Sequence, residues 1–167
     1  MSLLAVALAL LALVGGPPQI VHADGRVGQF RIDVTTKAQL VAVLGQPRTT
    51  EPATSARSRK PAGVRLVYSC GTNCDTVYSF SNRTGKLSDF ASASPSFRTE
   101  RGAGAGLTST QAAKLEGKPI VPSCGSGKTI HVRWDETHQF ALEVLRGRVT
   151  ILVYLGPHTT YYEPFGC

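Results

Sequence analysis

Thr36-Lys-Ala-Gln-Leu-Val-Ala-Val-Leu-Gly-Gln-Pro47 occurs a second time in the chain, in altered form, as Thr108-Ser-Thr-Gln-Ala-Ala-Lys-Leu-Glu-Gly-Lys-Pro119. Thr, Gln, Gly and Pro recur at the same relative positions, with an offset of 72 residues. Self-similarity at a fixed spacing is the signature of a repeat architecture. The chain is therefore predicted to contain two copies of one structural unit.

The four shared positions have the chemistry of helix ends. Thr36 and Thr108 suit the N-cap, and Gln39 and Gln111, three residues on, complete a capping box. A Gly after the last turn permits a left-handed backbone, and the Pro that follows prevents the helix from resuming. Each copy is predicted to open with a short helix of about nine residues.

Three strand-like segments follow each predicted helix. In the first copy, a loop rich in Thr, Ser and Arg is expected between Pro47 and Gly63, before the strands begin. The predicted strands are 64–69, 75–81 and 86–91 in the first copy, and 128–134, 139–145 and 148–155 in the second. The predicted fold class is α+β, with two tandem helix-on-antiparallel-meander repeats that form one continuous sheet.

Residues 1–23 are predicted to be a secretory signal peptide. Twelve apolar residues run from Leu3 to Val14, a Gly-Gly-Pro-Pro breaker follows, and Val21-His22-Ala23 suits signal peptidase. No Lys or Arg precedes the apolar run, which departs from the usual signal. The run is shorter than the ~20 residues of a membrane span, so no transmembrane segment is expected. The predicted organisation is 1–23 signal peptide, 24–98 first helix-plus-meander repeat and 99–167 second helix-plus-meander repeat.

Four cysteines follow the predicted signal: Cys70, Cys74, Cys124 and Cys167. An even number in an exported protein indicates disulfides, and four cysteines allow three pairings. Gly71-Thr-Asn73 is a turn-rich triplet that would bring Cys70 within bonding reach of Cys74. That pairing leaves Cys124 for Cys167.

The helix pattern T-x-x-Q-h-x-x-h-x-G-x-P (h apolar), followed by a meander, resembles the beta-lactamase-inhibitor-protein-like (BLIP-like) tandem repeat family. This family is related in fold to the small lipoprotein of the outer-membrane barrel-assembly machinery. Tandem inhibitor proteins of soil bacteria carry two copies, an export signal and one disulfide per copy. The resemblance covers nearly all of 24–167 and implies a bacterial, secreted binding module without catalysis, with Cys70–Cys74 in the first copy and Cys124–Cys167 in the second.

Two departures limit what the resemblance implies. The usual Gly-Met before the capping Thr is replaced by Val34-Thr35 and by Gly106-Leu107. The 12 aromatic residues are few for the aromatic binding face of this family. Inhibition of beta-lactamase is therefore not carried over to this chain.

Motifs for catalysis and cofactor binding are incomplete. Cys124-Gly-Ser-Gly-Lys-Thr129 ends like a P-loop, but Pro122 occupies the place of the first Gly and a strand pattern follows. Gly102-Ala-Gly-Ala-Gly106 lacks the third Gly of a dinucleotide loop and is predicted to be a flexible joint between the copies. The histidines and cysteines lack zinc-type spacing. No catalytic residue, metal, cofactor or nucleotide partner is expected.

Two regions are candidate partner-binding sites. Arg57, Arg59 and Lys60 form the densest basic cluster and lie in the predicted loop. The second region is the sheet face opposite Ile130, Val132 and Trp134, where His131, Arg133 and Tyr154 are the candidate contacts. By strand alternation, the residues expected on that face are Thr129, His131, Arg133, Glu143, Thr150 and Tyr154.

The net charge of +7 favours acidic partners. The first functional hypothesis is a secreted, non-catalytic protein-binding module, either a proteinaceous inhibitor or an envelope-associated interaction protein, with an unknown extracellular protein as partner. The alternative is a secreted binder of polyanions, such as an anionic cell-wall polymer, that acts through its basic charge. A secreted hydrolase is the least favoured alternative.

Overall fold

A computed structural model describes residues 18–54, 60–123 and 127–158 of the chain. Strands hold 49% and helices 12% of this part. In chain order the elements are β1 (Gln19–Val21), β2 (Arg26–Val27), β3 (Phe30–Arg31), α1 (Lys37–Leu44), β4 (Thr49–Thr54), β5 (Pro61–Ser69), β6 (Asp75–Ser81), β7 (Leu87–Ser92), β8 (Phe97–Thr99), α2 (Ser109–Glu116), β9 (Val121–Pro122), β10 (Lys128–Trp134), β11 (Gln139–Leu145) and β12 (Arg148–Leu155).

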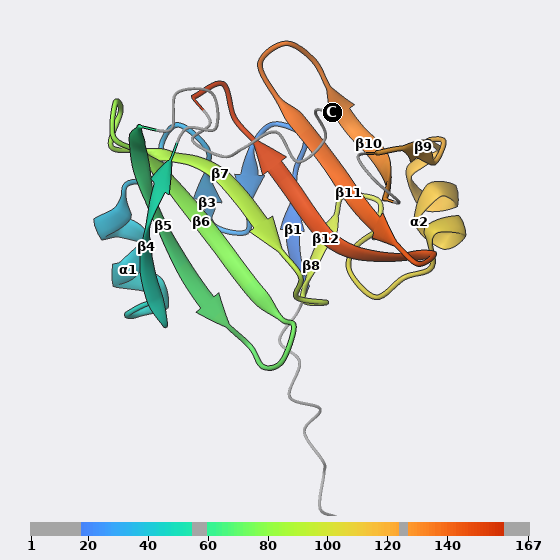
Figure 1. Cartoon of the computed structure of the whole chain (residues 1–167), viewed down its shortest axis with the longest axis horizontal. Helices are drawn as coiled ribbons and strands as arrows, with labels where there is room; N and C mark the ends of the chain where they lie inside the picture. Colours follow the sequence, from blue (N-terminus) through green and yellow to red (C-terminus); the bar gives the residue numbers. More distant parts are fainter. Residues whose placement is uncertain (1–17, 55–59, 124–126, 159–167) are drawn as a thin grey trace, which may run out of the picture.

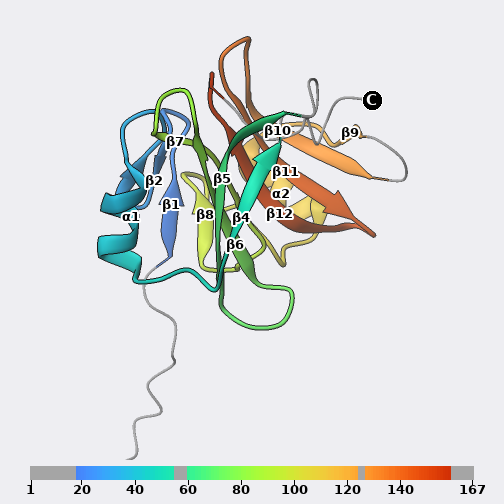
Figure 2. The same cartoon turned by 60° about the vertical axis from the view of Figure 1, so that its left-hand side comes forward.

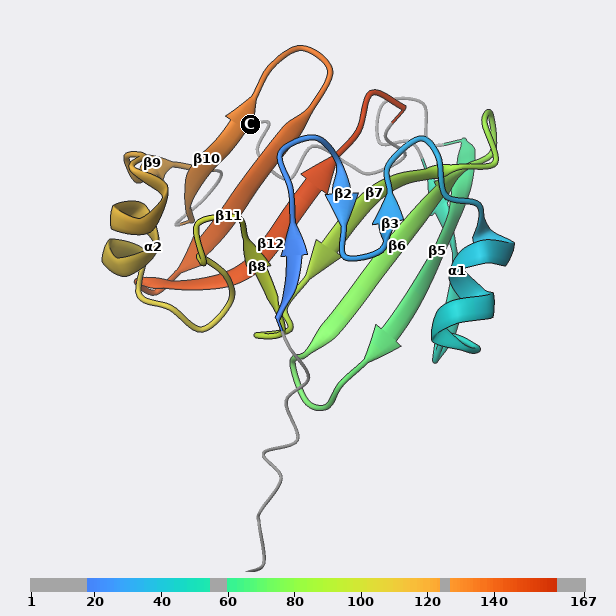
Figure 3. The ribbon, with the colours of Figure 1, turned by 180° about the vertical axis from the view of Figure 1, so that it is seen from behind.

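The strands form two sheets that lie face to face. Eight strands make a large antiparallel sheet in the order β4-β5-β6-β7-β12-β11-β10-β9. The other four make a small sheet in the order β3-β2-β1-β8, in which β1 and β8 run parallel. Figure 1 shows the large sheet in front, with α1 and α2 at its opposite ends. Figure 3 shows the small sheet across the rear of the large one, between the helices.

The predicted α+β fold, two tandem helix-on-meander repeats in one continuous sheet, is wrong. The described chain is mostly strand, and its strands form two separate sheets. The small sheet was missed because its strands have only two or three residues, too few to show an alternating pattern. The loop expected between Pro47 and Gly63 contains β4, which pairs with β5 from Thr49↔Val67 to Thr54↔Pro61.

The repeated motif specifies helix ends and little more. In both helices the capping Thr accepts from the backbone of the Gln three residues on, at 3.3 Å for Thr36 and 3.2 Å for Thr108. Each Gln side chain accepts in return from the backbone N–H of its Thr, which completes the box. Gly117 ends α2 in the left-handed conformation. These contacts are local, so the motif carried no information about the sheets.

An aromatic row joins the two sheets. Phe30 in the small sheet meets Tyr78 edge-on, with ring centroids 5.7 Å apart. Tyr78 lies 5.3 Å from Phe90, its neighbour in the large sheet, and Phe90 lies 4.9 Å from Phe97 of the small sheet. All four side chains are at most 7% exposed. The row starts and ends in the small sheet and passes through β6 and β7 of the large one.

Residues 102–106, which were predicted to be a flexible joint between the copies, are packed into the folded domain. Ala103 and Ala105 are buried, and a Cβ added at Gly104 would collide with the carbonyl oxygen of Phe97. β8 spans the predicted boundary between 24–98 and 99–167. Figure 2 shows this part of the chain passing from β8 toward α2 beside the large sheet.

β1 is part of the folded domain. Val21 is fully buried and lies opposite Thr99 of β8 and Val27 of β2. The carbonyl of Ala23 accepts from the guanidinium of Arg133 at 2.6 Å and from the hydroxyl of Tyr154 at 3.1 Å. A leader that ended at Ala23 would therefore take β1 with it.

The β5–β6 hairpin carries the predicted disulfide between Cys70 and Cys74, with Cα atoms 5.3 Å apart. Cys124 and Cys167 lie outside the described residues, so their pairing stays a prediction. Within the described ranges, no helix is long and apolar enough to cross a membrane.

Candidate functional site

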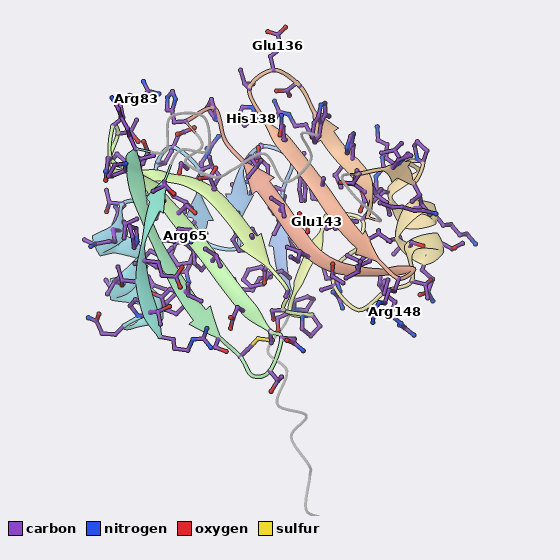
Figure 4. The ribbon with its side chains drawn as sticks, in the orientation of Figure 1. Arg65, Arg83, Glu136, His138, Glu143 and Arg148 are labelled. Atoms are coloured by element: carbon purple, nitrogen blue, oxygen red, sulfur yellow. A yellow bond between two sulfur atoms is a disulfide. The ribbon has the colours of Figure 1, made fainter. Side chains whose placement is uncertain are left out.

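The front face of the large sheet is the face on which a partner was expected. Strand register places Thr129 beside Glu143 and His131 beside Ala141 on this face. In Figure 4, Glu143 and Arg65 lie over the two halves of this face. The centre of the face is closed, because Asp89, Val153 and Leu155 expose at most 3%. A binding surface is therefore more accessible at the margins of this sheet than at its middle.

A β-bulge separates the expected contact residues onto two faces. The register of β10 against β11 shifts between His131 and Arg133, so Arg133 lies beside Phe140 of the core. Tyr154 is also opposite Phe140 and is fully buried. Its pKa is raised to about 12, mainly by burial. The expectation that Arg133 and Tyr154 share an open face with His131 is wrong, because strict alternation does not hold through the bulge.

Because of the same bulge, the side chain of Trp134 lies on the same face of the sheet as that of His131. The two rings stack with centroids 4.0 Å apart and planes 12° from parallel. Trp134 is 43% exposed and is the only tryptophan of the chain. Burial lowers the pKa of His131, which favours the neutral ring at neutral pH. The pair forms an aromatic surface at the margin of the sheet.

A hollow of about 260 Å³ lies beside this aromatic pair. We call it the β10 groove; its lining residues are Lys118, Pro119, Val121, His131, Val132, Arg133 and Trp134. One wall is the segment after α2, and the other is β10. Arg133 is held in place by Asp135, whose carboxylate accepts from its Nε at 2.6 Å. The hydrogen bond to Arg133 is the largest cause of the lowered pKa of Asp135.

A second hollow, of about 230 Å³, adjoins the first and shares Lys118 and Val132 with it. Glu116, at the end of α2, is 3% exposed and lines this second hollow. Its carboxylate accepts from the hydroxyl of Thr99, and its backbone carbonyl accepts from Arg101 at 2.6 Å. We call this hollow the Glu116 pocket.

Burial raises the pKa of Glu116, while the hydrogen bond from Thr99 and the charge of Arg101 oppose the rise. The folded state therefore binds the Glu116 proton more tightly than the unfolded chain does. This contribution to stability is fully present below the ordinary value of 4.5 and is lost as the pH rises through the folded-state pKa.

Replacing Glu116 with Gln is expected to flatten the fall in unfolding free energy as the pH rises above about 4.5. The amide keeps the size of the side chain but does not titrate. Urea unfolding at several pH values measures the effect. Glu136→Gln, at the exposed tip of the β10–β11 hairpin (Figure 4), is the matched control and should leave the natural profile in place. An unchanged profile in Glu116→Gln would contradict the assignment.

One other predicted contact, Lys60, lies apart from the β10 groove. Arg57 and Arg59 are outside the described residues, so their role as contacts stays a prediction. Lys60 is exposed and precedes β5, near the opposite end of the large sheet. Over the described ranges, no group of three or more His, Cys, Asp or Glu side chains could hold a metal ion.

Sequence reasoning missed Lys118, Glu116 and the exposure of Trp134. Alternation assigned Trp134 to the apolar face with Ile130 and Val132, and only the bulge reverses this. Neither Lys118 nor Glu116 was among the predicted contacts. Their part in two hollows depends on the packing of α2 against distant strands, and no local pattern encodes that packing.

Comparison with protein-family models and with curated proteins gave no match. Among solved structures, the chain is similar to an extracellular protein containing an SCP domain from Bacillus anthracis, at 12% identity and a TM-score of 0.46. The match covers 74% of this chain and 43% of that chain. A likeness at this level assigns neither fold nor activity.

Proposed function

We propose that the chain is a secreted, non-catalytic interaction protein that binds a partner protein at the β10 groove. The observation that carries the proposal is the partly exposed His131–Trp134 stack beside Lys118 and Arg133. Tryptophan and arginine are enriched among the residues that dominate binding energy at interfaces. A hollow beside an exposed tryptophan offers a partner side chain a desolvated pocket.

The acidic groups near the groove already have protein partners, which supports a binding role over catalysis. Glu116 accepts from Thr99, Glu100 accepts from His22 at 2.7 Å, and Asp135 holds Arg133. A catalytic acid or base must instead reach the proton it transfers. The groove therefore offers groups suited to recognition. The carboxylates near it position neighbouring residues and are not available for catalysis.

Export is supported by the apolar N-terminal run and by the Cys70–Cys74 bond. Disulfides persist mainly in oxidising compartments. Lys118, in a chain of net charge +7, complements an acidic extracellular partner.

The test places a photo-crosslinking residue at Pro119, on the wall of the groove, in the folded, disulfide-intact chain. Ala38 on the exposed side of α1, at the other end of the molecule, is the matched control position. Irradiation in culture fluid of the source organism should give one discrete protein adduct at position 119 and none at 38. Equal adducts at both positions, or none at either, would overturn the proposal.

A second candidate function, polyanion binding, is favoured by the net charge of +7. Binding to an anionic wall polymer should weaken steeply between low salt and ~0.2 M salt, because screening and counterion release govern such contacts. Binding through the β10 groove should depend on Trp134 and change less with salt. A salt titration of natural chain and Trp134→Ala separates the two functions.

A further inference from the structure

The Glu116 pocket is enclosed by segments that lie far apart in the chain. α2 ends at Glu116, β8 ends at Thr99, and β10 and β11 contribute Val132 and Phe140 to the lining. Figure 3 shows α2 and β10 at the same end of the large sheet. The pocket volume of about 230 Å³ is below the ~300–1,000 Å³ of sites for drug-sized ligands. The pocket therefore suits a small molecule.

Glu116 offers this pocket one carboxylate oxygen that the protein leaves open. Its Oε1 accepts from the hydroxyl of Thr99. Its Oε2 accepts no hydrogen bond from the residues that the structure describes, and this atom is not fully buried. The other carboxylate of the lining, Glu100, is occupied at both oxygens, by the ring of His22 at 2.7 Å and by the backbone N–H of Ala23 at 3.4 Å. A ligand donor that enters the pocket would therefore meet Glu116.

The surroundings of Glu116 favour a positively charged ligand group. Glu116 is the last residue of α2, and the carboxyl end of a helix carries a partial negative charge. Burial raises the pKa of Glu116, because removal from water disfavours the carboxylate form. The hydrogen bond from Thr99 and the charge of Arg101 oppose this rise only in part. A cationic group in the pocket would stabilise the carboxylate that burial disfavours.

Two cationic side chains and an apolar wall complete the lining. Lys118 is exposed and forms no ion pair with the described residues. Arg101 donates from Nη1 to the backbone carbonyl of Glu116 at 2.6 Å, which uses one of the five N–H groups of its guanidinium. Both cations can donate to a ligand carboxylate. Val132 and Phe140 supply the apolar part. A small ligand with an ammonium, a carboxylate and an apolar group would match all three parts.

We infer that the Glu116 pocket binds a free α-amino acid with a small aliphatic side chain. The ammonium of the ligand donates to Oε2 of Glu116, its carboxylate accepts from Lys118 and Arg101, and its side chain contacts Val132. This inference goes beyond the proposed function and does not depend on it. Crosslinking at Pro119 tests the β10 groove alone, because Pro119 lines that groove and not the Glu116 pocket.

Isothermal titration calorimetry of the full, disulfide-intact chain with three small molecules tests the ligand class. L-Valine carries both charges, 3-methylbutanoate lacks its ammonium, and 2-methylpropylamine lacks its carboxylate. L-Valine should bind with a Kd of about 1 mM or lower, and each of the other two about tenfold or more weakly. Binding of either analogue as tightly as L-valine would overturn the inference. So would failure of L-valine to saturate the chain at about 10 mM.

Substitutions locate the ligand in the pocket. Glu116→Gln removes the charge but keeps the size of the side chain, and it should weaken L-valine binding by about tenfold. Lys118→Met should weaken it by several-fold, and this exposed position keeps the test available if Glu116→Gln does not fold.

The matched controls are Glu136→Gln and Lys37→Met, which change the same residue types at exposed positions outside the pocket. Both controls should bind L-valine as the natural chain does, and circular dichroism checks that all four variants fold. Unchanged binding in both pocket variants, or equal losses in the pocket variants and their controls, would place the amino acid elsewhere and overturn the inference.

Discussion

A chain that begins at Asp24 is expected to be largely unfolded under conditions in which a chain that begins at Pro18 is stable. The shorter chain lacks β1, whose three residues pair with Phe97–Thr99 and whose Val21 is fully buried. Each fully buried aliphatic side chain contributes about 1.5–3 kcal/mol. The loss also leaves β2 and β8 without their common neighbour. A total on the order of 5 kcal/mol would equal the whole stability of a marginal domain.

Urea unfolding followed by Trp134 fluorescence and circular dichroism measures this effect. In the chain from Pro18, Val21→Ala should cost about 2–4 kcal/mol through its cavity. Val34→Ala, the same substitution at a side chain 56% exposed, should change stability by at most ~0.5 kcal/mol. If the chain that begins at Asp24 unfolds cooperatively at the same urea concentration as the chain that begins at Pro18, β1 is dispensable. Intact mass of the exported protein should correspondingly place its first residue at or before Gln19.

Phe90→Ala is expected to destabilise the domain by about 3–5 kcal/mol, because it removes the middle of the aromatic row. Phe90 is 1% exposed and contacts Tyr78 within the large sheet and Phe97 in the small one. Its loss would open a cavity between the sheets and break both ring contacts. The midpoint of thermal or urea unfolding measures the change.

Two further variants show whether the loss of stability comes from the buried position of Phe90 or from the removal of an aromatic ring as such. Phe90→Leu keeps most of the volume and should cost less than ~1.5 kcal/mol. Trp134→Ala removes a larger ring from an exposed site and should alter stability far less, as measured by circular dichroism. A cost for Phe90→Ala no larger than that for Trp134→Ala would contradict the role of the row in joining the sheets.

Features encoded by neighbouring residues could be predicted from the sequence. Both capping boxes formed as expected, because Thr36 and Gln39, or Thr108 and Gln111, need only one helical turn to meet. β10, β11 and β12 have the predicted bounds, since each shows a strand-like run between turns. The Cys70–Cys74 bond followed from the turn between the two residues.

Features that depend on contacts between distant residues could not be predicted from the sequence. β1 and β8 are three residues each, and they are strands only because they pair with each other and, for β1, with β2. The β10 groove depends on a bulge that no residue pattern marks and on the position of Lys118 after α2. Repetition of the helix motif suggested repetition of the whole fold, although its shared residues describe helix ends alone.

The parallel pairing of β1 with β8 constrains the order in which the molecule assembles. Gln19 pairs with Phe97, which lies far along the chain. When the chain is synthesised from its N-terminus, β1 is made long before β8. Parallel pairing of strands far apart in sequence is slow, because the entropy cost of closing the long loop comes before the stabilising contacts form. The rear layer therefore cannot close before β8 is made, and until then the apolar back of β4 to β7, the strands of the large sheet that precede β8 in the chain, faces solvent. Such an intermediate is prone to aggregation, so the interval before β8 arrives is when this protein most needs protection from self-association.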